Sequence, residues 1–197
     1  MLRIGLTGGI CSGKSLVGRM LLEQDNLDLI SADELARALC SPGKEAYTLI
    51  VERFGAEILN DQAMIDRRKL GQLVFSNREH LIELEEMIHP LVLRDIEDEI
   101  SRLKMDYIVI EIPLLFEANF QDCVDVIVVV ACTEDLQIER SQKRDGISED
   151  EVRQRMIRQM PLREKVAQAD FVIDNNQGED ETRRQVESLW PKIKTPK

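Results

Sequence analysis

Residues 8–15 read GGICSGKS, a complete G-x-x-x-x-G-K-S pattern, and they follow the short apolar run LRIGL of residues 2–6. The glycines of such a loop let its backbone curl until the N–H groups point at phosphate oxygens. Lys14 then reaches the β- and γ-phosphates, the Ser15 hydroxyl ligates magnesium, and a helix that begins near Lys14 adds its positive N-terminal end. The order of strand, loop and helix therefore predicts a site for a nucleoside triphosphate. The residues expected to contact it are Gly9, Ile10, Cys11, Ser12, Gly13, Lys14, Ser15 and Leu16.

Five apolar segments rich in β-formers punctuate the chain, and a helix-like or turn-like stretch follows each of them. They are residues 2–6, 27–30, 107–112, 124–132 and 171–173. The run VDVIVVV at residues 124–130 is nearly all apolar, which is typical of a strand that helices cover on both faces. The pattern predicts an α/β fold with a doubly wound, five-stranded parallel sheet flanked by helices.

About seventy residues separate the second and third expected strands, far more than a crossover needs. Helix signals stand out there: SPG at 41–43 precedes a helical pattern over 44–54, Asp66 precedes 67–75, and Ser76 with Glu79 forms a capping box before 81–88. His89 before Pro90 predicts a further helix start. We therefore expect a helical insertion over residues 35–100, within a core of residues 1–34 and 101–197.

A second charged region spans residues 134–165. It contains a capping box in the run SEDE at residues 148–151. It also carries six arginines, namely Arg140, Arg144, Arg153, Arg155, Arg158 and Arg163.

Composition narrows the class of protein. The net charge of −11 repels polyphosphate backbones, which argues against nucleic acid as a partner. The longest apolar runs are too short to span a bilayer, and no secretory signal is evident, so we expect a cytoplasmic protein without a membrane role. The four cysteines show neither zinc-ligand nor disulfide-framework spacing.

A phosphate loop alone fits a kinase, a GTPase, a motor or a transport ATPase. The chain has no Asn-Lys-x-Asp guanine-reading motif, and its length suits a small metabolite kinase. Such an enzyme needs a carboxylate near the acceptor hydroxyl and arginines that neutralise charge on the transferred phosphoryl group.

Asp33 is the candidate carboxylate, because it follows the second expected strand at the end where α/β sheets bind ligands. The alternative is that Asp33 merely sits in the first turn of a helix, which Ser31 and Glu34 cap. Arg140 and Arg144 are four residues apart and so share one helix face, which could equally be a solvated, salt-bridged surface.

Motifs along nearly the whole chain resemble the dephospho-CoA kinase family, which phosphorylates the ribose 3′-hydroxyl of dephospho-CoA. They are LTGGI at 6–10, Ala32-Asp33, Phe54-Gly55, RRKL at 67–70, His89-Pro90-Leu91, PLLFE at 113–117, Gln137 with Arg140 and Arg144-Asp145, Arg155 with Gln159, Ala169-Asp170 and Ile173-Asp174-Asn175.

The resemblance implies a P-loop kinase fold and two substrates, ATP, used with Mg²⁺, and dephospho-CoA. It implies that Asp33 accepts or orients the ribose hydroxyl, that residues 35–100 shape the acceptor site, and that residues 134–165 form a lid over ATP. Lys14 and Arg140 would then act on the phosphates, and Asn175 would lie near the adenine.

Three positions depart from the family pattern. Cys11 replaces a loop glycine, so the backbone there must keep φ negative or tolerate a side chain. Ser31 stands where Asp is common and brings no charge, while Glu111 stands where Asp is common and would reach magnesium through water.

Two other functions remain open from the residues. One is another nucleoside- or metabolite-directed P-loop kinase. The second is a regulatory protein that binds ATP without turning it over, with Asp33 acting only as a cap. The oligomeric state is left open.

Overall fold

A computed structural model describes residues 1–194 of the chain. The chain divides into two compact units, which are described one at a time. The first comprises Met1–Ser31 and the chain from Lys104 onward, and the second is Ala32–Leu103.

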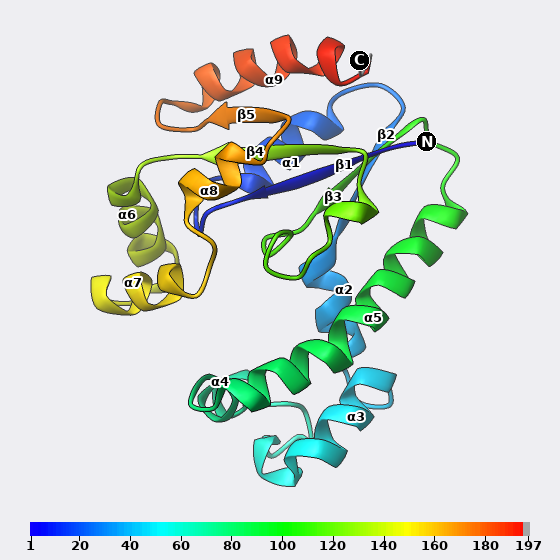
Figure 1. Ribbon diagram of the computed structural model, residues 1–197, viewed down its shortest axis with the longest axis vertical. Helices are drawn as coiled ribbons and strands as arrows, with labels where there is room; N and C mark the ends of the chain where they lie inside the picture. Colours follow the sequence, from blue (N-terminus) through cyan, green and yellow to red (C-terminus); the bar gives the residue numbers. More distant parts are fainter. Residues whose placement is uncertain (195–197) are drawn as a thin grey trace. The chain divides into compact units, whose positions relative to one another are not determined.

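The first unit is built on a five-stranded sheet (Figure 1). Its strands are β1 (Leu2–Gly8), β2 (Leu27–Ser31), β3 (Tyr107–Glu111), β4 (Val126–Ala131) and β5 (Phe171–Asp174). Their order is β2-β3-β1-β4-β5, and every neighbouring pair is parallel. The predicted α/β fold and its five strands are therefore confirmed, with ends shifted by one or two residues.

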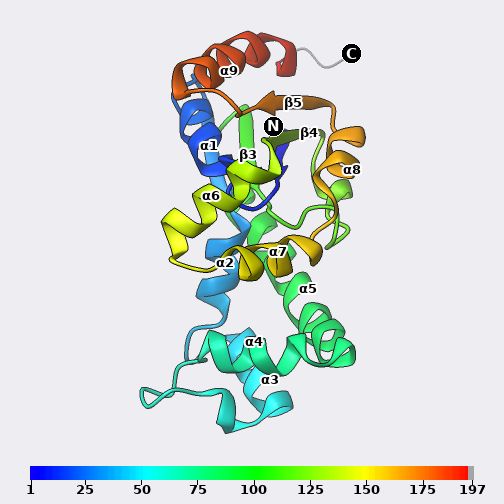
Figure 2. The same ribbon diagram turned by 90° about the vertical axis from the view of Figure 1, so that its left-hand side faces the viewer.

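Helices cover both faces of this sheet, as the apolar strand β4 predicts. Helix α1 (Lys14–Leu22) contacts β1, β2 and β3, and α9 (Glu179–Ile193) contacts α1 and β5. Helix α8 (Leu162–Ala167) packs on β4, and Figure 2 shows it on the opposite side of the sheet from α1. The remaining helices of this unit are α6 (Glu134–Asp145), α7 (Glu149–Ile157) and the short 3₁₀ turn η2 (Gln121–Cys123).

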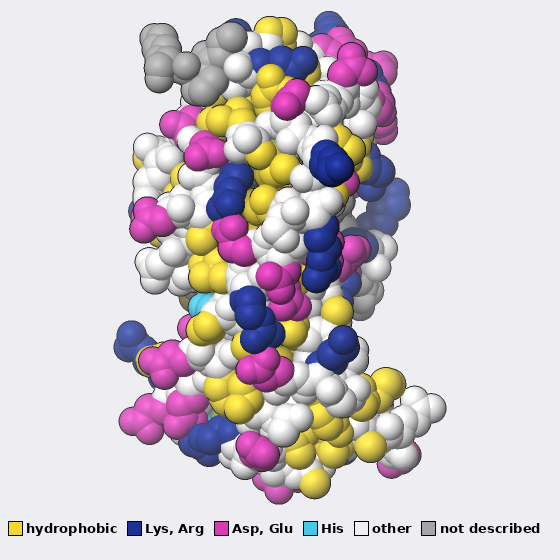
Figure 3. Space-filling view, turned by 90° about the vertical axis from the view of Figure 1, so that its right-hand side faces the viewer, with side chains coloured by type: hydrophobic (Ala, Val, Ile, Leu, Met, Phe, Trp, Pro, Cys, Tyr) yellow, Lys and Arg dark blue, Asp and Glu magenta, His cyan; other side chains and the backbone are white. Residues whose placement is uncertain are grey.

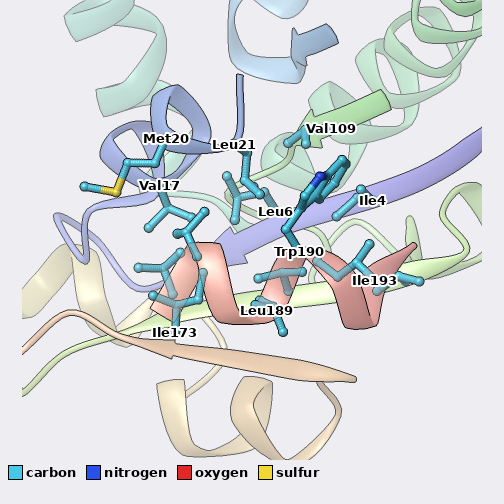
Figure 4. Packing of buried hydrophobic residues seen from close by; sticks show 14 of the residues in the cluster. Ile4, Leu6, Val17, Met20, Leu21, Val109, Ile173, Leu189, Trp190 and Ile193 are labelled. Carbon is cyan, nitrogen blue, oxygen red and sulfur yellow. The ribbon is translucent and has the colours of Figure 1, made fainter. Parts of the chain in front are cut away.

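The core on one side of the sheet joins β1, α1 and α9 (Figure 4). Ile4 and Leu6 alternate along β1 toward this core, where they are fully buried, and Trp190 packs with them. Gly5 faces the other side: a Cβ atom there would lie 2.8 Å from Leu115 Cδ1, so only glycine fits without repacking. Burial of this alternating strand fixes the position of the loop that follows it.

The second unit is helical throughout its regular structure. It contains α2 (Ala32–Leu39), α3 (Glu45–Phe54), the 3₁₀ turn η1 (Ala56–Ile58), α4 (Arg67–Phe75) and α5 (Arg78–Arg102). Helix α5 contacts α2, α3 and α4 and so forms the centre of the unit. Asp66 caps α4 as predicted, because its side chain accepts hydrogen bonds from the N–H groups of Arg68 and Lys69.

Two local predictions in this unit were wrong. Asn77, not Ser76, caps α5, while the Ser76 hydroxyl turns back to donate to the Leu73 carbonyl at the end of α4. Pro90 does not begin a helix but lies inside the 25-residue α5. A proline removes only one backbone donor, and the contacts that α5 makes with three neighbouring helices hold the helix together across it.

The part of the chain that the structure describes contains no helix both long enough and apolar enough to cross a membrane. On the face in Figure 3, basic and acidic side chains are interspersed and no large field of one sign appears. The net negative charge is thus not gathered on that face.

Candidate active site

The loop of residues 8–15 leaves the carboxyl end of β1 and enters α1, as predicted. Gly13 has φ +104°, and a Cβ atom there would lie 2.0 Å from Asn175 Nδ2. Gly8 likewise approaches β4 so closely that a Cβ atom would lie 2.2 Å from the Val130 carbonyl oxygen. Glycine is required at both positions, because any side chain would collide with polar backbone or amide atoms.

Cys11 adopts φ +48°, the left-handed region that glycine favours. The sequence analysis left two alternatives for Cys11, a negative φ or a side chain tolerated at positive φ. The structure shows the second alternative. A side chain here costs roughly 1 kcal/mol of backbone strain, and the packed loop holds it.

Lys14 begins α1, and its ammonium group folds back over the loop. Lys14 Nζ donates to the Gly9 carbonyl oxygen at 2.9 Å and lies 3.5 Å from the Gly8 carbonyl oxygen. The N-cap of α1 is Gly13, so no side chain caps the first turn of this helix. The lysine charge and the positive helix end therefore converge on one loop, an arrangement that suits an anion such as a polyphosphate.

Ser15 and Glu111 meet beside this loop. Ser15 Oγ, in the first turn of α1, donates to Glu111 Oε1 at 3.0 Å, and Glu111 is the last residue of β3. A hydroxyl beside a carboxylate provides the hard oxygen donors that Mg²⁺ prefers. The donor set fits a magnesium ion that also binds nucleotide phosphates.

Asn175 lies at the centre of a buried hydrogen-bond network and is 3% exposed. Its Nδ2 donates to the Ser12 carbonyl oxygen at 2.7 Å, and its Oδ1 accepts from Thr182 Oγ1 at 2.8 Å. The family resemblance implies that Asn175 lies near an adenine; in the structure both ends of its side chain bind other parts of the protein. The network ties the loop to α9.

Arg140 reaches the same network from α6. Its Nη2 donates to the Asn175 carbonyl oxygen at 3.0 Å, while its Nη1 is buried without a hydrogen-bond partner in residues 1–194. A buried guanidinium nitrogen without an acceptor is costly, so an anionic ligand would satisfy it. Arg140 is thus positioned by the protein at one nitrogen and available to a phosphate at the other.

Arg144 is held differently, although it shares the helix with Arg140. Its guanidinium donates to both carboxylate oxygens of Asp145, at 2.7 and 3.0 Å, and Arg155 donates to Asp145 at 3.2 Å. Arg144 accordingly lowers the pKa of Asp145. Arg144 and Asp145 therefore form an ion pair between neighbouring residues.

Asp33 lies in the first turn of α2, in the second unit. Its exposed side chain lines a pocket of about 450 Å³ together with Arg37, Cys40, Met64 and Arg67. No residue in 1–194 donates a hydrogen bond to the Asp33 carboxylate, and neither arginine forms an ion pair within that range. The pocket therefore offers one acidic and two basic groups to a ligand.

A larger pocket of about 920 Å³ lies in the first unit, beside the phosphate loop. It runs from Gly9 and Gln137 to the junction of α7 and α8, where Met156, Met160 and Leu162 line it. The charged segment predicted over residues 134–165 thus encloses space next to the loop.

Comparison with known proteins agrees with this geometry. The family model described as dephospho-CoA kinase matches residues 2–181. The dephospho-CoA kinase of Carboxydothermus hydrogenoformans is 46% identical over 194 residues, which is 97% of this chain and 94% of that protein.

The chain belongs to the dephospho-CoA kinase family.

A second relative, the dephospho-CoA kinase of Geobacillus kaustophilus, is 45% identical over 188 residues and covers 94% of this chain and 93% of its own. Among solved structures, the dephospho-CoA kinase of Campylobacter jejuni superposes with a TM-score of 0.70 at 27% identity, covering 97% of this chain and 96% of its own. Shikimate kinase from Aquifex aeolicus shares the fold, with a TM-score of 0.55 at 20% identity and 96% coverage of both chains. The predicted P-loop kinase fold and ATP-dependent phosphotransferase activity are thereby confirmed.

Some residues of the site could not be identified from the amino-acid sequence of this chain alone. Thr182 and the buried Lys165 carry no motif, and only the fold brings them beside the nucleotide loop and its neighbours. The PLLFE motif that contains Glu117 is part of the family pattern, but it did not indicate what Glu117 does.

Proposed function

We propose that this protein transfers the γ-phosphoryl group of ATP to the ribose 3′-hydroxyl of dephospho-CoA, which yields coenzyme A and ADP in a cytoplasmic biosynthetic step. Beyond family membership, one observation carries the proposal: the exposed Asp33 carboxylate lines a pocket with two arginines that form no ion pair in the described chain. Direct in-line transfer requires no covalent enzyme intermediate.

The phosphate loop holds the donor end of the reaction. Backbone N–H groups of residues 9–16 and the α1 terminus bind the β- and γ-phosphates, and Lys14 balances their charge. Ser15 and Glu111 would together hold Mg²⁺, which would neutralise negative charge on the phosphates. Arg140, through its unsatisfied Nη1, stabilises the charge that develops on the transferred group.

The pocket of the second unit holds the acceptor end. Asp33 accepts the proton of the attacking hydroxyl, or orients that hydroxyl, and its exposed carboxylate is available for the task. Arg37 and Arg67 suit the acceptor's diphosphate, because a guanidinium group can donate two parallel hydrogen bonds to the oxygens of one phosphate. A carboxylate that only capped α2 would need no such pocket.

Residues 134–165 act as the lid in this proposal. Helix α6 carries Arg140 and Arg144, and α7 carries Arg155. Arg144 and Arg155 both form ion pairs with Asp145. Closure over the nucleotide excludes water and completes the charge clamp around the γ-phosphate.

A coupled ADP-release assay with four acceptors tests the function: dephospho-CoA, adenosine, AMP and shikimate. Contacts remote from the reacting hydroxyl raise the rate of transfer as well as the affinity. We expect dephospho-CoA to exceed adenosine and AMP in kcat/KM by at least about a hundredfold, or roughly 2.7 kcal/mol of transition-state binding. The Lys14→Ala variant, which lacks the phosphate clamp, is the control for contaminating kinases.

Phosphorus NMR of the product locates the new phosphate. It should lie on the ribose 3′ oxygen and not on the pantetheine end. Comparable turnover of adenosine would contradict the acceptor assignment, and ATP binding without turnover of any acceptor would favour a nucleotide-sensing protein.

A further inference from the structure

Lys165 is the largest side chain that the first unit buries completely. Its Nζ lies 2.8 Å from Glu117 Oε1 and donates to the Pro113 carbonyl oxygen at 3.1 Å. Buried ion pairs contribute little net stability, because desolvation of both charges offsets their attraction. Apolar side chains of similar size would fill the same space at less cost, so the pair calls for another explanation.

The two acceptors of Lys165 each bind a second part of the chain. The Pro113 carbonyl oxygen also accepts from Thr7 Oγ1 at 3.2 Å, and Thr7 is the fully buried residue that immediately precedes Gly8 of the phosphate loop. Glu117 Oε1 also accepts from the Met160 backbone N–H at 2.8 Å, at the junction between α7 and α8. The ammonium group thus joins the loop's entry strand to the end of the charged segment.

This position matters for two groups that handle phosphate. Pro113 lies two residues after Glu111, so a fixed Pro113 carbonyl restrains the strand end that presents Glu111 to Ser15. Met160 lines the large pocket beside Gly9, so a fixed Met160 N–H sets where the predicted lid meets the core. Glu117 Oε2 is buried without a hydrogen-bond partner in the described residues, so Oε1 alone carries this connection.

We propose that Lys165 is a positioning residue for phosphoryl transfer: with Glu117 it holds the base of the lid at Met160 and, through Pro113, the strand end that carries Glu111. Lys165 itself touches no substrate. This inference rests on the proposed function, since it assigns a lid and a magnesium-binding strand end.

The decisive variant is Lys165→Met with Glu117→Gln. It removes the fully buried charge of Lys165 and the charge of Glu117, whose side chain is 20% exposed. It also fills the space of the lysine stem and leaves an amide oxygen to accept from Met160 N–H. We expect a folded protein whose kcat falls at least about tenfold, while its KM for ATP stays within about threefold. Displacement of the phosphate-handling groups slows phosphoryl transfer more than it weakens the binding of ATP in the ground state. Arg183→Met is the matched control, since it breaks an exposed ion pair between Arg183 on α9 and Glu23 at the end of α1 and should leave kcat unchanged.

Amide hydrogen exchange gives a second readout that does not depend on turnover. A non-hydrolysable ATP analogue should protect residues 149–160 in the parent protein and in Arg183→Met, and protect them much less in the double variant. If the double variant does not fold, Glu117→Gln alone keeps the shape and is expected to lower kcat about threefold and to reduce the protection in part.

The outcomes separate this inference from the proposed function. A folded double variant with kcat within about twofold of the parent, or with full protection by the analogue, overturns the role of Lys165. If the parent itself does not phosphorylate dephospho-CoA, the proposed function fails, and the exchange experiment still decides whether Lys165 anchors the segment over bound nucleotide.

Discussion

Ser15 Oγ donates a 3.0 Å hydrogen bond to Glu111 Oε1, which joins the first turn of α1 to the end of β3. Ser15 belongs to the phosphate-loop motif, and Glu111 lies beside it because β3 pairs directly with β1. The two side chains together define the expected magnesium position.

Glu111→Gln should therefore raise the Mg²⁺ concentration for half-maximal activity by about tenfold, since the amide keeps the bond from Ser15 but loses the charge. Activity titrated with Mg²⁺ at fixed ATP measures this shift. Glu111→Asp, with the family's more common residue, should stay within about threefold of the parent. An unchanged Mg²⁺ requirement in Glu111→Gln would remove Glu111 from the metal site.

Asp33→Asn should lower kcat by roughly 10² or more while the binding of ATP and dephospho-CoA persists, because the amide keeps the shape and loses the basicity. Steady-state kinetics and thermal unfolding measure the two effects. Asp28, an acidic residue on β2, provides the control through Asp28→Asn. A kcat within a few fold, together with a lower Tm, would show that Asp33 serves only to stabilise α2.

Arg140→Ala should lower kcat more than it lowers affinity for ATP alone, because Nη1, which has no partner in the described residues, would engage the phosphates fully only on closure of the proposed lid. Arg144→Ala should be milder, since Arg144 is already paired with Asp145. Pre-steady-state kinetics alongside calorimetric ATP titration separates the two parameters. Equal and small effects would reduce this helix face to ordinary solvated surface.

Asn175→Asp should cost about 2–3 kcal/mol of stability and weaken ATP binding, because a carboxylate oxygen would face the Ser12 carbonyl oxygen in place of the amide donor. Chemical denaturation and ATP-analogue titration test this. Thr182→Val removes the bond to Asn175 Oδ1 and the longer, 3.5 Å bond to the Gly178 carbonyl oxygen, and it should cost about 1 kcal/mol with normal affinity. Normal ATP binding by a folded Asn175→Asp variant would contradict a structural role in the loop.

Cys11→Gly should leave ATP binding within about threefold and raise stability slightly, because glycine adopts φ +48° without strain. Gly13→Ala is the contrasting variant: it adds a Cβ atom where Asn175 lies and should abolish nucleotide binding. Weakened binding in Cys11→Gly would mean that the Cys11 side chain itself contributes to the site.

Much of the local structure of this protein could be predicted from short sequence patterns. The strands of the sheet, the phosphate loop, the cap at Asp66 and the capping box of Ser148 and Glu151 each depend on residues close in the chain, and the structure bears them out. The Asn77 cap and the uninterrupted α5 were missed, because several nearby residues can cap a helix and packing overrides a proline.

The sequence by itself determined the fold class, the family and the nucleotide loop, since periodic burial and a contiguous motif leave few alternatives. Only the tertiary structure decided which distant groups meet. Asn175 binds Ser12 across 163 residues, and Lys165 binds Pro113 across 52, contacts that no local pattern encodes. Such partners are chosen by the order of strands in the sheet and by the need of buried donors and acceptors to find one another.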